Sequence, residues 1–312
     1  MNDQHLIDNL CQSASAGQPA RADILALQPL STDALRARAR RFLSTLHEAG
    51  ACPSDRADLA ERGERSVLHL PEGARAVVYH ASGALHYVSG LAPLDAPFER
   101  LEETAVLQRQ LNEAAQRLNV ASWAAEGGSL AFERLWRTKA QGADRAGRVA
   151  EALLVRATGA WRHALGGIPV LGAASVAITL AGSGAVAALG VNLRPLASEV
   201  LDSAIVLAPE VAARQVAERL ATLLGRAKEP LPRDLIESAT MRFGYLDLGR
   251  RKAQRVLAPA YVAQVALRHA QERQAYVIAV QGTERHYMEL PLYGNEAVIT
   301  RARGEHCKPG LA

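Results

Sequence analysis

The chain has 312 residues, and 49% of them are hydrophobic, which suffices for a globular protein with a sizeable core and two domains. It carries 36 basic and 32 acidic residues, and this formal charge of +4 gives no support for a nucleic-acid binder. The sequence pI of 9.1 slightly favours acidic partners. Three dissimilar cysteines, Cys11, Cys52 and Cys307, predict neither a disulfide framework nor a zinc site.

The first eight residues are acidic and lack the cationic lead and apolar stretch of a secretory signal, so the sequence predicts a cytoplasmic protein. A helix follows Ser31, with Leu35, Phe42, Leu43 and Leu46 as its apolar residues. The arginines of this helix point to several sides, which is typical of a solvated face. They are Arg36, Arg38, Arg40 and Arg41.

Residues 164–193 contain no charge and are long enough for a membrane span, so this interpretation needs a test. Val176, Ile178 and Leu180 alternate with small or polar residues, which is the period of a half-buried strand. The glycines of 181–184 then supply a turn, and the segment is predicted to be a β-hairpin that does not cross a membrane. A dinucleotide loop at 182–187 is disfavoured because too few residues precede Pro195 for the required helix.

Most other segments also read as short strands and amphipathic helices. The stripe Leu107, Leu111, Ala115 and Leu118 predicts a helix packed against the preceding hairpin. Even spacing places Leu130, Phe132 and Trp136 on one side of a strand. Further strands are predicted at 66–70, 75–80, 84–89, 150–163, 241–246, 261–267, 275–280 and 286–290, and further helices from Pro209 to about Gly225 and at 234–239.

This pattern predicts an α+β fold of antiparallel sheets with helices packed on one face, in repeated hairpin-plus-helix modules. Four consecutive segments are expected. They are an N-terminal helical segment (1–64), a small hairpin-plus-helix module (65–125), an antiparallel sheet with a helix (126–228) and a second sheet module with a short tail (229–312).

Two short motifs resemble known domains. Residues 167–172, Gly-Ile-Pro-Val-Leu-Gly, precede a hairpin and a helix, and residues 257–262, Leu-Ala-Pro-Ala-Tyr-Val, precede the strand at 275–280. Both are similar to the PepSY and fungalysin/thermolysin propeptide families, over residues 150–290. The resemblance implies inhibitors, intramolecular chaperones or regulators of secreted proteases, or sensor modules. No His-Glu-x-x-His protease motif accompanies it here.

Motifs that carry chemistry are absent from the sequence. The nine histidines have no metal-ligand spacing, and no Gly-x-Ser-x-Gly elbow occurs, so neither a metal nor a cofactor is predicted. Cys307 has a neighbouring imidazole and cation, but its place near the end of the chain favours a tail.

Aromatic and cationic residues give the candidate ligand-binding site. Two neighbouring strands would unite Arg134, Trp136 and Lys139 with Trp161, Arg162 and His163, as a groove for a peptide or an anion. Core tryptophans with solvated cations are the simpler interpretation. Tyr261, His286 and Tyr287 present the same choice between a concave binding face and core packing.

We therefore expect a non-enzymatic binding or regulatory protein that recognises a protein or peptide, with an open sheet edge as one route. The alternative is an enzyme of unfamiliar type with a pocket between modules, using His163 and Glu133, or His286 and Glu284, as acid and base. Sheet edges that pair between subunits would instead make a homo-oligomer.

Overall fold

The computed structural model describes residues 3–14, 17–54, 58–173, 175–225, 231–269, 272–290 and 297–300. Helices and antiparallel strands give this part of the chain the predicted α+β fold. The chain divides into two compact units. The large unit contains residues 25–199 and 246–257, and the small unit contains the segments 1–24, 200–245 and 258–312. Neither unit is continuous in sequence, so they do not coincide with the four consecutive segments expected.

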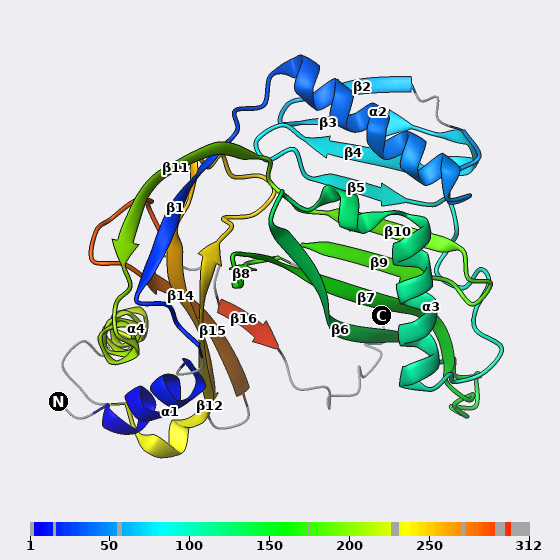
Figure 1. The fold of residues 1–312 in the computed structure, drawn as a ribbon. Helices are drawn as coiled ribbons and strands as arrows, with labels where there is room; N and C mark the ends of the chain where they lie inside the picture. The colour runs from blue at the N-terminus through cyan, green and yellow to red at the C-terminus, as the bar shows by residue number, and fades with distance from the viewer. Residues whose placement is uncertain are drawn as a thin grey trace. The chain divides into compact units, whose positions relative to one another are not determined.

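In the large unit, antiparallel strands form one sheet in the order β2-β3-β4-β5-β10-β9-β7-β6 (Figure 1). A short strand, β8 (Ile168–Leu171), folds back on β7 through Gly166 and Gly167, both at positive φ as a tight hairpin requires. The bounds are β2 (Asp58–Arg62), β3 (Arg65–His69), β4 (Arg75–Tyr79), β5 (Leu85–Val88), β6 (Gly128–Ala140), β7 (Leu153–Leu165), β9 (Val176–Leu180) and β10 (Val186–Val191).

The hairpin predicted within residues 164–193 is confirmed, because β9 and β10 pair antiparallel. None of the helices in the described ranges is both long and apolar enough to span a membrane.

Two helices, α2 (Thr32–Glu48) and α3 (Thr104–Arg117), cover one face of this sheet (Figure 1). The Ser31 side chain caps α2 by accepting a hydrogen bond from the Ala34 amide at 3.2 Å. Phe42 and Leu46 of α2 and Leu111 of α3 join the sheet residues in one buried cluster. Both helices therefore form because an apolar stripe along each has a sheet to cover.

The large unit repeats one module, a helix followed by four strands. The first is α2 with β2, β3, β4 and β5, and the second is α3 with β6, β7, β9 and β10; their last strands, β5 and β10, pair with each other. Repetition was predicted, but the order within the module was not. Leu111 of α3 packs beside Gly159 of β7, so α3 covers strands that follow it and not the preceding hairpin.

The small unit contains a third run of the same kind. Helix α4 (Pro209–Leu223) packs on α1 (Gln4–Ala14) and on β15, and the strands that follow it have the order β12-β14-β15-β16. Helix α4 was expected to complete the sheet before it, and this expectation is wrong because its apolar face covers later strands. The bounds are β12 (Ile236–Leu246), β14 (Pro259–His269), β15 (Glu272–Gln281) and β16 (Ala297–Thr300).

Besides β2, β8 and β16, three further strands were not predicted: β1 (Arg21–Leu27), β11 (Leu196–Ile205) and β13 (Val256–Leu257). They pair in the order β11-β1-β13 with partners far away in sequence, which no local pattern reveals. The helix predicted at 234–239 is one short 3-10 turn, Arg233–Leu235, and two others lie at Pro71–Gly73 and Val120–Trp123.

Two arginines of the large unit, Arg38 and Arg194, donate to backbone carbonyls of distant segments. Arg38 of α2 donates to the carbonyls of Gly83 at 2.7 Å and Leu193 at 2.6 Å, which corrects the solvated face predicted for it. Arg194 has a side chain only 4% exposed. It pairs with Asp247 at 2.9 Å and donates to three carbonyls, those of Ala81, Gly249 and Lys252.

We expect Arg194→Met to lower the free energy of unfolding of the large unit by about 3–5 kcal/mol, because it leaves the Asp247 carboxylate buried without its partner. Urea denaturation followed by tryptophan emission measures this, since all three tryptophans lie in that unit. Arg251→Met, on an exposed side chain of the same loop, is the control. Equal shifts in the two variants would contradict the assignment.

Candidate functional site

Strand β6 forms one end of the large unit's sheet and carries the predicted aromatic and cationic cluster. It pairs with β7 over its full length, and no strand in the described part of the chain pairs with its other edge. The register sets Trp136 opposite Thr158 and Phe132 opposite Trp161. The two strands are therefore neighbours, as predicted, but the two tryptophans do not meet.

A β-bulge at Glu133 separates the tryptophans. Phe132 pairs with Trp161 and Arg134 with Ala160, so Glu133 is an extra residue in β6. The extra residue turns Leu135 toward the helix-covered face and Trp136 to the opposite face. The even spacing of Leu130, Phe132 and Trp136 therefore misled the sequence interpretation, because the bulge interrupts it.

Trp136 is 44% exposed, and the guanidinium of Arg134 lies 5.6 Å from the centroid of its ring. Lys139 pairs with Leu154, beyond a second irregularity, which places it on the other face of β6 with Arg137. Arg134 and Trp136 thus flank the open edge on one face, and two cations flank it on the other.

The cluster residues that lie in β7 pack or form hydrogen bonds within the fold. Trp161 is 5% exposed and meets Phe132 edge-to-face at a centroid distance of 5.3 Å. Arg162 holds Glu133 at 2.7 Å and donates to the Val170 carbonyl at 2.9 Å. Glu133 therefore has a cationic partner other than the imidazole of His163.

His163 is buried, at 3% exposure, and its Nε2 is a buried side-chain atom without a hydrogen-bond partner in the part of the chain described. Gly128 packs against this nitrogen so closely that a Cβ there would lie 2.4 Å from it. Burial lowers the pKa of His163 below its usual value. This imidazole is thus buried and neutral, and it does not take part in a groove at the open edge of β6.

The remaining predicted residues lie in the small unit. Tyr261 is fully buried, and its hydroxyl donates toward Gln18 at 2.8 Å and the Leu207 carbonyl at 2.6 Å, so it packs in the core. Residues 286–290 are irregular and not the predicted strand. His286 and Glu284 consequently do not share a strand face.

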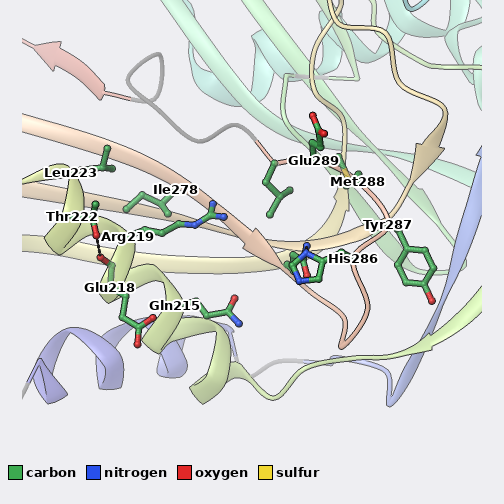
Figure 2. A pocket seen from close by; sticks show the side chains of 12 residues that line it. Gln215, Glu218, Arg219, Thr222, Leu223, Ile278, His286, Tyr287, Met288 and Glu289 are labelled. Atoms are coloured by element: carbon green, nitrogen blue, oxygen red, sulfur yellow. Dashed lines mark hydrogen bonds between the residues drawn. The ribbon is translucent and has the colours of Figure 1, made fainter. Parts of the chain in front are cut away.

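His286 and Tyr287 line an open groove of about 1080 Å³ between α4 and the segment 286–290 (Figure 2). Two of its polar side chains already have partners: Arg219 donates to the Ala279 carbonyl, and His286 is hydrogen-bonded to Gln281. Tyr287 points away from α4 in Figure 2 and donates to Asp202, which raises its pKa. The groove offers no pair of acid and base in contact, so it gives the enzyme alternative no support.

A metal-ligand set is also lacking in the described residues, which hold no group of three or more His, Cys, Asp or Glu side chains suited to an ion. Cys307 lies outside the described residues.

Comparisons with known proteins give the fold and no function. No family model matches the chain, and no curated protein matches it. A crystal structure of an uncharacterized protein from Eubacterium rectale is similar, with a TM-score of 0.50 and 8% identity over 89% of this chain and 88% of that one. The resemblance to the PepSY and propeptide families stays a prediction.

We expect Trp136 to supply most of the acrylamide-accessible tryptophan emission, because Trp123 and Trp161 are only 6% and 5% exposed. Trp136→Phe should lower the Stern–Volmer slope to that of shielded indoles and shift the emission maximum to shorter wavelength. Trp161→Phe is the matched control and should leave the slope equal or higher. An unchanged slope in Trp136→Phe would refute the exposed position.

We expect the large unit to lose stability on acidification through His163. Its pKa is lowered in the folded state, so the unfolded chain binds the proton first, and stability falls as pH drops below about 6.5, by no more than about 1.4 kcal/mol per pH unit. Urea denaturation at pH 7.5 and 5.5 should show a smaller difference for His163→Phe than for wild type. His69→Phe, on an exposed histidine of β3, should keep the wild-type difference.

Proposed function

We propose that the protein is a non-enzymatic binding protein that takes up an acidic, extended peptide segment along the open edge of β6. The observation that carries the proposal is the edge strand β6, which has 13 residues and includes Trp136 with 44% of its surface exposed. Open strand edges add a further strand through main-chain hydrogen bonds, and tryptophan with arginine is a favoured anchor of binding sites.

The positive charge along β6 favours an acidic peptide as the occupant of the open edge. Arg134, Arg137 and Lys139 flank the edge, while the one acidic residue of β6, Glu133, is paired with Arg162. A second copy of β6 pairing along this edge would bring cations against cations, which is unfavourable. An acidic peptide would gain ion pairs at the same positions, so it is favoured over self-association.

The other end of the sheet differs. Strand β2 has only five residues, and its neighbouring Glu61 and Arg62 carry opposite charges. Short, charged edge strands are a common protection against unwanted pairing. The long β6, whose one acidic residue is paired with Arg162, is the edge better suited to a partner.

A display library of random eight-residue peptides, selected on the immobilised protein, tests the proposal. We expect the selected peptides to carry net negative charge and to shield Trp136 from acrylamide. Trp136→Ser should weaken their binding by roughly 30-fold, as loss of an anchoring aromatic residue does. Trp161 is left intact because its truncation would damage the core.

Charge reversal on β6 is a second test, and charge reversal on β2 is its control. Arg134→Glu with Lys139→Glu should abolish binding of the selected acidic peptides, whereas Arg62→Glu, on β2, should leave it unchanged. A selected pool without acidic bias, or equal loss in both charge variants, would contradict binding at β6. Assembly of the wild type with rising concentration, blocked by the β6 variants, would favour a homo-oligomer instead.

A further inference from the structure

A second hollow lies within the large unit, between α2 and the strands β2, β3 and β4. Its volume is about 730 Å³, within the range of small-molecule sites. The lining residues come from the first helix-and-four-strand module, away from the β6 edge of the sheet. We name it the α2 groove.

Apolar side chains form the inner surface of the α2 groove. Leu35, Ala39 and Leu43 recur at every fourth position of α2 and make one stripe. The sheet contributes Leu68 of β3 and Val78 of β4. Ala39, Leu43, Leu68 and Val78 belong to the buried core, so they form the floor of the groove. Leu35 is only partly buried, and a hydrocarbon chain lying on this floor would cover the apolar surface that it leaves in water.

Cations stand on the helix side of the opening. Arg36 and Arg40 are four residues apart and both line the groove. Arg36 reaches Asp33 at 3.7 Å in a pair whose side chains are 52% and 93% exposed, a weak interaction in water. Arg40 has no ion pair or side-chain hydrogen bond in the described part of the chain.

The other polar groups need no ligand. Ser66 and His80 hydrogen-bond to each other across β3 and β4, with 2.7 Å between Oγ and Nε2. Glu61 is exposed on the edge strand and is outnumbered by the two arginines. Among the charged side chains that line the groove, cations therefore outnumber anions, which favours an anionic ligand.

We propose that the α2 groove binds a free monocarboxylate with an unbranched apolar chain, of the fatty-acid class. The chain lies on the Leu35, Ala39 and Leu43 stripe, and Arg36 and Arg40 hold the carboxylate. Guanidinium groups suit carboxylates because their planar donors match both oxygens. This site is separate from the proposed peptide edge and would stand if peptide binding failed.

Calorimetric titration with sodium hexanoate, octanoate and decanoate, each below the concentration at which it aggregates, tests the proposal. We expect one saturable site, with affinity rising about fourfold for each added methylene as the chain is buried. Decanol should bind at least tenfold more weakly than decanoate, since it brings no charge to the arginines.

Arg36→Gln with Arg40→Gln should lower decanoate affinity tenfold or more while leaving decanol binding unchanged. Arg62→Gln removes a cation from β2 outside the groove and should bind decanoate as wild type does. Arg134→Glu with Lys139→Glu, which disables the proposed peptide edge, should also bind normally. Circular dichroism and thermal melting confirm that each variant folds.

Three results would overturn the proposal: no saturable decanoate binding, equal affinity for decanoate and decanol, or undiminished decanoate affinity in the double glutamine variant. The chain-length series uses only the wild type, so it decides the question of the apolar surface even where a variant fails to fold.

Discussion

The large unit depends on the buried guanidinium of Arg194. Its donors gather Asp247 and the carbonyls of Gly249 and Lys252, which arrive more than fifty residues later in the chain, together with Ala81 from the turn after β4. Loop carbonyls cannot be buried without donors, and one planar guanidinium supplies several. The segment 246–257 can therefore join a unit from which it is distant in sequence.

Other arginines repeat this device. Arg156 donates to the carbonyls of Asp95 at 3.0 Å and Ala92 at 2.5 Å, and Arg38 serves Gly83 and Leu193. Burial lowers the pKa of Arg38 to about 10, so it keeps its charge at neutral pH. All but four of the 36 basic residues are arginine, and several of these arginines donate hydrogen bonds to loop carbonyls. The net charge of the chain therefore does not by itself indicate a partner, because part of the positive charge is used within the fold.

The sequence pattern predicted the elements whose formation depends on residues close to one another in the chain. The β9–β10 hairpin and the helices starting near Ser31 and Pro209 follow from periodicity, turn glycines and capping residues. Strands β1 and β11 escaped prediction because their partners lie far along the chain. The contacts of Arg38 could not be read from its helix either, since its acceptors belong to Gly83 and Leu193.

The candidate site shows how one residue redirects such a pattern. With strict alternation, Trp136 would share the helix-covered face with Phe132, and both tryptophans of the hairpin would be core. Glu133, inserted as a bulge and held by Arg162, shifts the phase so that Leu135 takes the inner position and Trp136 the outer one. An acidic residue beside its arginine thus leaves an aromatic anchor exposed at the edge of β6. The bulge connects the fold to the proposed function, because it places the exposed tryptophan beside the open edge.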